Sequence, residues 1–233
     1  MRAFQRPKVF LGLPGDPFTL FYDYDQVEEN KLTPLDGKQK AKWFERRLGM
    51  TFLEPLRRIW KEDSVSENLL ASKLNPSVEC SFSVASMAIM LSVVEALGSF
   101  RKPELAEPED EGKHWEMFID FLGAHMKEWN RNIGNNVSVP TVLWRSFRNG
   151  ITHGLRVGQV PSSDDLWGSL EHHTNFTDKQ KRRFEEYGRL LRICPEDFFD
   201  DLESGAKDYF TKLYASQDLL AKFERRFNKV YPN

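Results

Sequence analysis

The chain has 233 residues, of which 40% are hydrophobic, 13% aromatic and 29% charged, with a formal net charge of -2. This aromatic content excludes an intrinsically disordered chain, and the near-zero charge excludes nucleic-acid binding through overall positive charge, though not through a local basic site. The two cysteines, Cys80 and Cys194, lie in no CxxC or Cys/His pattern, which argues against a disulfide scaffold and a structural zinc site.

Residues 1 to about 36 show no helical periodicity and are rich in proline and aromatic residues, which predicts an irregular or short-strand arm. The first residues lack the apolar core and cleavage site of a signal peptide. The most apolar run, residues 82–97, is shorter than the about 20 residues that a membrane span needs. We therefore expect a soluble, cytoplasmic protein with no membrane partner.

Residues 37–61 have the pattern of an amphipathic helix, interrupted near Gly49 and Pro55. Hydrophobic residues recur there at every fourth position: Phe44, Leu48, Phe52, Leu56 and Trp60. The same segment has an excess of lysine and arginine, and six of these residues are weak candidates for RNA binding: Lys38, Lys42, Arg46, Arg47, Arg57 and Arg58. The more frequent explanation for such a run is the solvated face of an amphipathic helix.

Residues 81–98 are apolar on nearly every side, which predicts a central buried helix with Gly98 as its C-terminal cap. An acidic linker follows at residues 103–112, and residues 113–130 carry the periodicity of another helix. The apolar stripe of that helix contains Trp115, Phe118, Ile119, Leu122, Met126 and Trp129.

A helix is predicted to begin at Ser138, with Pro140 in its first turn, and to end at Gly154. Beyond it, residues 155–161 are expected to form a short strand that pairs with residues 189–194.

Between those two strands, a polar helix is predicted over residues 178–187. Two final helices are expected, from Pro195 to about Ala215 and from Ser216 to about Tyr231. The pattern as a whole is typical of a mainly helical protein with a small β element inserted late.

The most informative string is Phe147-Arg148-Asn149-Gly150-Ile151-Thr152-His153-Gly154. It resembles the R-N-x-x-x-H signature of the HEPN superfamily, a group of helical domains named for nucleotide binding in higher eukaryotes and prokaryotes. The resemblance extends over roughly residues 80–215, since the apolar helix ending after Glu95 and the segment from Phe198 look like the first and closing helices of that family.

The angular positions around an α-helix, about 100° per residue, place Arg148, Arg145, Asn149 and Thr152 opposite the buried side of Phe147. Asn149 and His153, four apart, lie together, whereas Arg148 and His153, five apart, lie at the two edges of the polar face. Glu95 is the lone charge in its apolar helix and is predicted to pair with Arg148. This pairing fits a functional polar face or ordinary core electrostatics.

The resemblance implies a homodimer in which the residue 138–153 helices of two copies meet and form one composite site. In such a site Arg148 and His153 would be catalytic together with Asn149, and Glu95, Arg145 and Thr152 would support them. The implied chemistry is RNA cleavage without a metal or a cofactor, in a toxin or phage-defence role. RNA or a nucleotide is the implied ligand, and an antitoxin or another protein the implied partner.

One feature departs from the family. The members that are regulated by nucleotidylation carry a tyrosine close to the motif histidine, where this chain has Thr152, Gly154 and Leu155. We therefore do not expect that mode of regulation.

The predicted fold is mainly α: a HEPN-like helical bundle with an N-terminal extension and a small β-hairpin insertion. Residues 1–78 are predicted to form the extension and residues 79–233 the helical domain, with the β insertion near 155–194. The leading function is a metal-independent endoribonuclease. The alternatives are a non-catalytic dimeric module that binds nucleotide, RNA or a protein, and a helical protein whose polar helix only holds the fold together.

Overall fold

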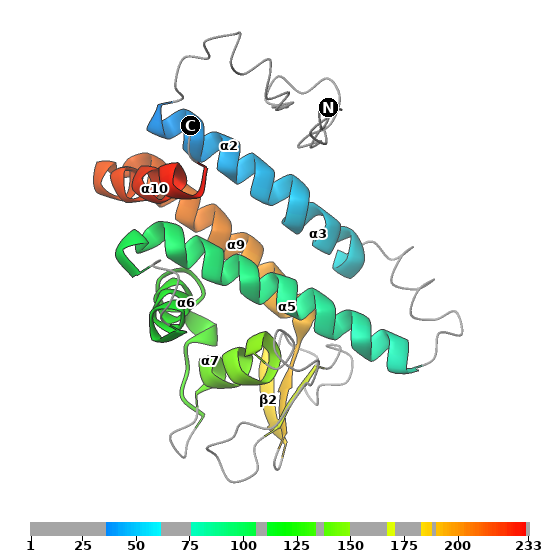
Figure 1. Cartoon of the computed structure of the whole chain (residues 1–233). Coiled ribbons are helices and arrows are strands. Elements are labelled where there is room, and N and C mark those ends of the chain that lie inside the picture. The colour runs from blue at the N-terminus through cyan, green and yellow to red at the C-terminus, as the bar shows by residue number, and fades with distance from the viewer. Residues whose placement is uncertain are drawn as a thin grey trace, which may run out of the picture.

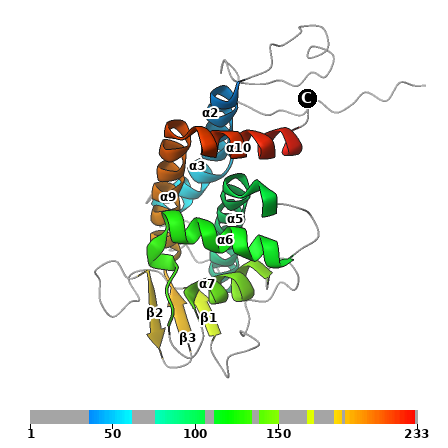
Figure 2. The ribbon, with the colours of Figure 1, turned by 90° about the vertical axis from the view of Figure 1, so that its left-hand side faces the viewer.

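A computed structural model describes seven ranges of the chain: residues 36–61, 76–105, 111–133, 138–149, 167–170, 183–187 and 190–231. The described part is mainly helical, as predicted. Helices α2 and α3 follow one another along one side of the molecule, α5 runs through the middle, and a small sheet lies with α7 at the end opposite α10 (Figures 1 and 2). The predicted arm over residues 1–35 lies outside the described residues.

Helix α2 (Gly37–Leu48) begins at Asp36, whose carboxylate accepts a hydrogen bond from the Gln39 backbone N–H at 2.8 Å while the Gln39 side chain bonds back to Asp36 N–H. A π-helical turn, η1 (Gly49–Leu53), joins it to α3 (Glu54–Lys61), so the predicted interruption is present. A π turn has more residues per turn than an α-helix, so the four-residue spacing does not keep Phe52 on the face of Leu48 and Leu56. Phe52 is 40% exposed, whereas Leu48 and Leu56 are buried.

The central helix α5 (Pro76–Arg101) is longer than predicted and is buried over most of its second half. Gly98 does not cap it: the helix continues, and a Cβ at this position would collide with the Met117 carbonyl oxygen of the neighbouring helix. Gly98 is therefore the point where two helices cross closely. The stretch Val84–Arg101 is apolar enough to span a membrane, but 56% of it is buried, as in the core helix of a soluble protein.

Helix α6 (Glu111–His125) crosses α5, and a 3₁₀ turn, η3 (Lys127–Trp129), follows it. Its predicted apolar stripe is confirmed for Phe118, Leu122 and Met126, all buried. A second 3₁₀ turn, η2 (Pro103–Leu105), occupies the start of the predicted acidic linker.

The last two helices, α9 (Pro195–Ala215) and α10 (Gln217–Val230), have the predicted bounds within one residue. Pro195 opens α9, followed by Glu196 and Asp197 in its first turn, and the Ser216 hydroxyl caps α10.

The small sheet has three strands in the order β1 (Trp167–Leu170), β3 (Leu190–Ile193), β2 (Phe184–Tyr187). Strand β3 lies within the strand predicted over residues 189–194, but its antiparallel partner is β2 and β1 pairs with it in parallel. The prediction of a helix over residues 178–187 is wrong for residues 184–187, which form β2. The predicted strand over residues 155–161 lies outside the described residues.

One hydrophobic core joins the segments on both sides of residue 78. The Phe44 ring of α2 lies 4.3 Å from that of Phe100 in α5 and 5.7 Å from that of Phe223 in α10, measured between centroids. Lys40 of α2 is also buried and donates to Glu224 and Asn228 of α10. The helices of residues 37–61 are thus packed into the bundle, while a domain boundary at residue 78 stays a prediction.

Candidate functional site

The segment that carries Arg148 starts as predicted. The Ser138 hydroxyl caps α7 (Val139–Val142) by accepting a hydrogen bond from the Thr141 backbone N–H at 3.3 Å. From Leu143 the chain continues as a π-helix, η4 (Leu143–Asn149), rather than as the α-helix that the angular prediction assumed. The 100° spacing therefore does not hold over this segment.

Arg148 pairs with Glu95, as predicted. Its Nε donates to Glu95 Oε2 at 3.1 Å and its Nη2 to Oε1 at 3.2 Å, so the guanidinium binds both carboxylate oxygens. Both side chains are largely buried, with 19% of Arg148 and 16% of Glu95 exposed. The guanidinium carbon also lies 4.6 Å from the ring centroid of Trp144, four residues earlier. These contacts place the Arg148 side chain against α5.

A third polar residue, His114, joins this pair. Its Nδ1 lies 2.6 Å from Glu95 Oε1, and its side chain is 30% exposed. His114 comes from the first turns of α6, Glu95 from α5 and Arg148 from η4, so three separate elements meet at one carboxylate. We call these three residues the Glu95 cluster.

The sequence prediction did not include His114 among the site residues. The contact depends on how α5 and α6 cross, and Gly98 and Met117, each three residues beyond the paired Glu95 and His114, set that crossing. The sequence signal for this close crossing is Gly98 itself, which its position near the end of the apolar run predicts to be a helix cap.

The other predicted site residues are placed only in part. Arg145 is exposed on η4, and Asn149 is the last residue of that element, with a side chain outside the described atoms. Thr152 and His153 lie outside the described residues. The structure thus brings Arg148 and Glu95 together, and the position of His153 relative to them stays a prediction.

Several of the six basic candidates on α2 and α3 already have acidic or aromatic neighbours. Arg57 pairs with Glu54 and Glu203, and Arg58 lies 3.5 Å from Glu54. The Arg47 guanidinium lies 5.2 Å from the Trp43 ring centroid. Lys38, Lys42 and Arg46 are exposed.

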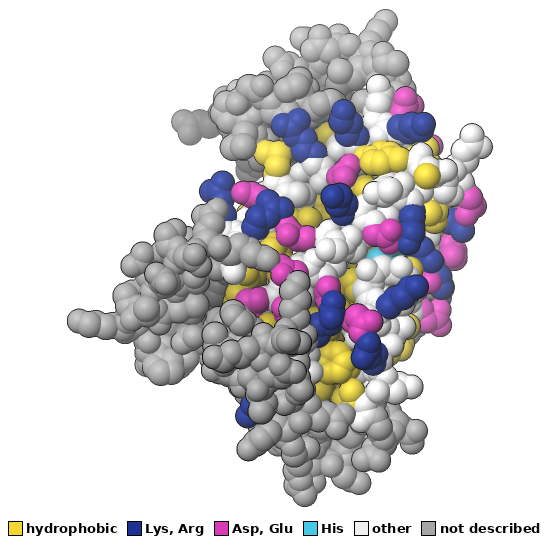
Figure 3. Space-filling model, turned by 180° about the vertical axis from the view of Figure 1, so that it is seen from behind, with side chains coloured by type: hydrophobic (Ala, Val, Ile, Leu, Met, Phe, Trp, Pro, Cys, Tyr) yellow, Lys and Arg dark blue, Asp and Glu magenta, His cyan; other side chains and the backbone are white. Residues whose placement is uncertain are grey.

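On the face shown in Figure 3, opposite to the view of Figure 1, Lys and Arg side chains alternate with Asp and Glu and do not gather into one basic patch. A role of α2 and α3 in RNA binding stays a prediction.

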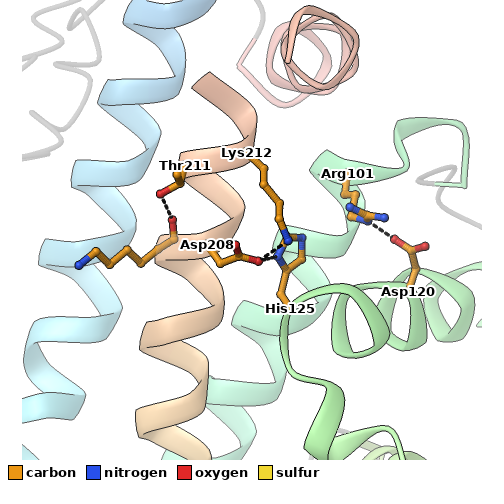
Figure 4. A network of polar contacts seen from close by, with 7 residues as sticks. Arg101, Asp120, His125, Asp208, Thr211 and Lys212 are labelled. Carbon is orange, nitrogen blue, oxygen red and sulfur yellow. Dashed lines mark hydrogen bonds and ion pairs between the residues drawn. The ribbon is translucent and has the colours of Figure 1, made fainter. Parts of the chain in front are cut away.

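A second polar cluster lies at the other end of α6 (Figure 4). His125 Nδ1 lies 2.7 Å from Asp208 Oδ2, and Lys212 Nζ donates to the same oxygen at 2.6 Å. The imidazole is fully buried, and burial lowers the pKa of His125 below its ordinary value. We call His125, Asp208 and Lys212 the Asp208 cluster.

The buried surroundings of His125 point to a structural role for this histidine. The His125 ring packs against Phe121 and Tyr209, with centroid distances of 4.9 and 5.7 Å. Its Nε2 is buried and finds no hydrogen-bond partner among the described residues. The nearby Arg101–Asp120 ion pair ties α5 to α6 (Figure 4).

Within the described ranges, no group of three or more His, Cys, Asp or Glu side chains is arranged to hold a metal ion. Cys194 is free and buried, and burial raises the pKa of its thiol well above the ordinary value. Comparisons with known proteins give no match: no family model fits the chain, and no curated protein or solved structure is significantly similar to it.

Proposed function

We propose that the chain is a HEPN-like endoribonuclease that works without a metal ion. The observation that carries this proposal is the Arg148–Glu95 pair at the position of the R-N-x-x-x-H resemblance. A largely buried guanidinium that is held by a bidentate carboxylate and an indole ring has a fixed orientation. A fixed cation is what a site needs to stabilise the negative charge that develops on a phosphodiester during cleavage.

In the proposed reaction, Arg148 contacts the scissile phosphate and His153 transfers a proton. The ribose 2′-oxygen attacks the neighbouring phosphorus, and the bond to the 5′-oxygen of the next nucleotide breaks. The products are a 2′,3′-cyclic phosphate and a free 5′-hydroxyl. Asn149 would orient His153 or the phosphate, and Glu95 would position Arg148.

The proposed active form is a homodimer, with the residue 138–153 segments of two copies facing each other across a two-fold axis. On the described part of that segment, the side chains that are not buried are polar: Ser138, Thr141, Arg145 and Arg148. Such a surface suits an interface that also encloses a polar substrate. A cytoplasmic toxin or defence role, with an antitoxin or another protein as partner, belongs to the same proposal.

The test is cleavage of total RNA in excess EDTA by the unchanged protein, His153→Ala and Arg148→Ala. We expect the unchanged protein to release fragments with cyclic phosphate ends and both variants to lose at least about 100-fold in rate. Arg131→Ala is the matched control, because Arg131 is 56% exposed and pairs only locally with Glu128. Equal inactivity of the unchanged protein and His153→Ala would refute the proposal.

A second candidate is a non-catalytic dimeric module that binds nucleotide, RNA or a protein. The observation that favours it is that Glu95 already neutralises Arg148, which is only 19% exposed. This candidate predicts RNA binding without cleavage, weakened by Arg148→Ala. Fluorescence anisotropy with a labelled RNA, read beside the cleavage assay, separates the two candidates.

A further inference from the structure

We propose that His114 is a catalytic residue of this site and is the base that takes the proton from the ribose 2′-hydroxyl. This inference rests on the proposed ribonuclease function and adds to it a residue outside the R-N-x-x-x-H string. It would place a base, its orienting carboxylate and the phosphate-binding arginine within one chain. The second copy would not be needed to complete that part of the site.

The hydrogen bond to Glu95 determines which nitrogen of the His114 imidazole carries the hydrogen. An ionised carboxylate can only accept hydrogen bonds, so the 2.6 Å contact to Glu95 Oε1 means that His114 Nδ1 carries the hydrogen. In the neutral ring Nε2 is then an unprotonated nitrogen with a lone pair. A carboxylate that orients one imidazole nitrogen and leaves the other free for proton transfer is the arrangement of a general base.

The exposure of the three side chains points the same way. His114 is 30% exposed, whereas Glu95 beneath it is 16% exposed. No hydrogen bond to His114 Nε2 is found among the described residues. His125, on the same helix and with the same kind of carboxylate bond, is 0% exposed and cannot receive a substrate in this conformation.

RNA cleavage also requires a cation near the base to bind the phosphate, and Arg148 supplies it. Its Nη2 and His114 Nδ1 donate to the same atom, Glu95 Oε1. A phosphodiester that reaches Arg148 therefore lies next to the imidazole. The shared carboxylate also offsets the positive charge that the imidazole gains with the proton.

The proposed step balances as follows. His114 Nε2 removes the 2′-hydroxyl proton, the O2′–P bond forms, and Arg148 stabilises the negative charge on the phosphoryl oxygens. The P–O5′ bond then breaks, and O5′ takes a proton from water, directly or through the proton-transfer residue of the proposed function. His114 afterwards releases its proton to water. No oxidant, reductant or metal takes part.

The competing role for His114 is purely structural, as a hydrogen-bond donor that holds Glu95. Two substitutions separate these roles. In His114→Asn the amide nitrogen takes about the position of Nδ1, so the bond to Glu95 can be kept while the basic nitrogen is lost. In His114→Ala both are lost, and added imidazole can replace the missing base but not the side chain's contacts with the fold.

The experiment measures single-turnover cleavage of a short RNA in EDTA, with circular dichroism melting curves for every variant. We expect His114→Asn to fold and melt close to the unchanged protein and to cleave about 100-fold more slowly, and added imidazole to restore His114→Ala at least tenfold. His125→Asn, the same substitution at the buried histidine of α6, should keep the rate.

The possible outcomes distinguish the role of His114 from the ribonuclease function as a whole. A His114→Asn rate within threefold of the unchanged rate, or no rescue of His114→Ala by imidazole, overturns the role of His114 and leaves the ribonuclease function standing. Absence of cleavage by the unchanged protein overturns both. If His114→Ala does not fold, the cleavage rate and melting curve of His114→Asn still test the role of His114.

Discussion

The Glu95 cluster and the Asp208 cluster contain the same kinds of residues but differ in whether the carboxylate or the histidine is the more deeply buried. Each takes a histidine from α6, His114 or His125, and each histidine bonds through Nδ1 to a carboxylate that also holds a cation. In the first, the imidazole is 30% exposed above a carboxylate that is 16% exposed. In the second, the imidazole is 0% exposed beneath a carboxylate that is 43% exposed.

This difference decides what each cluster can do. A carboxylate that is buried needs both of its partners, because an unpaired charge in the interior is costly, and its outward imidazole can meet a substrate. A carboxylate at the surface is hydrated and needs its partners less, while its buried imidazole contributes mainly packing. Substitutions in the two clusters test this contrast through their effects on stability.

Glu95→Ala should have the largest effect, because it leaves Arg148 and His114 without their shared acceptor. We expect a loss of about 3 kcal/mol in the free energy of unfolding, measured by urea denaturation. Asp208→Ala should cost about 1 kcal/mol, since water can replace the exposed carboxylate as the partner of His125 Nδ1. Equal losses for the two variants would show that the clusters do not differ as described.

Gly98→Ala tests the crossing that holds the Glu95 cluster together. A Cβ at residue 98 collides with the Met117 backbone, so α5 and α6 must separate near Glu95 and His114. We expect a loss of about 2 kcal/mol and a change in the His114 ring resonances in an NMR spectrum.

Gly49→Ala is the matched control for that substitution, because Gly49 has helical φ and ψ and no atom within 4 Å of an added Cβ. It should stabilise the protein by about 0.5 kcal/mol. A Gly98→Ala protein as stable as the unchanged chain would contradict the close crossing.

The pH dependence of stability should carry a contribution from His125. Because burial lowers the pKa of His125 in the folded protein, the unfolded chain binds a proton first as the pH falls below about 6.5. This contribution is fully present above that pH and is lost as the pH decreases toward the folded-state pKa. Arg101 and Lys212 lower the folded-state pKa further, and Asp208 opposes them.

Urea denaturation between pH 7.5 and pH 5 checks this contribution, since the stability of His125→Asn should fall less over this range than that of the unchanged protein. Parallel curves for the two proteins would contradict the buried neutral state of His125.

Lys212→Ala should have the smallest effect. The Lys212–Asp208 pair spans one turn of α9, and the two side chains are 51% and 43% exposed. Exposed pairs of this kind contribute about 0.5 kcal/mol or less, and salt screens them. We expect a change within that range in thermal denaturation at low salt and none at high salt, whereas a loss as large as that of Glu95→Ala would contradict the assignment of this pair to the surface.

The helical parts of the fold were largely predictable because their signals are local. Pro195 and Ser216 mark helix starts by their own chemistry, and the stripe of Phe118, Leu122 and Met126 predicts a buried face from spacing alone. The strand at residues 184–187 was not predictable in this way, because pairing with β3 overrides the local preference of a polar, charged segment.

The part of the candidate site that could be predicted is the pairing of Glu95, because its need for a cation is evident from its own position in the sequence. Glu95, the only charged residue within residues 81–98, requires a cation, and Arg148 meets that requirement. The π-helical form of η4 escaped prediction because residue spacing was interpreted with α-helical geometry. The role of His114 was not predicted because its contact with Glu95 depends on a helix crossing, and the sequence indicates that crossing only through the glycine at position 98.

The most direct test of the account is the chemistry of the RNA ends. A defined RNA oligonucleotide is incubated in excess EDTA with the unchanged protein, with Arg148→Ala and with His114→Asn, and the products are identified by mass spectrometry. The proposed mechanism yields fragments ending in a 2′,3′-cyclic phosphate with the unchanged protein and leaves the RNA intact with the two variants over the same time. Intact RNA with all three proteins, or equal cleavage by all three, would contradict it.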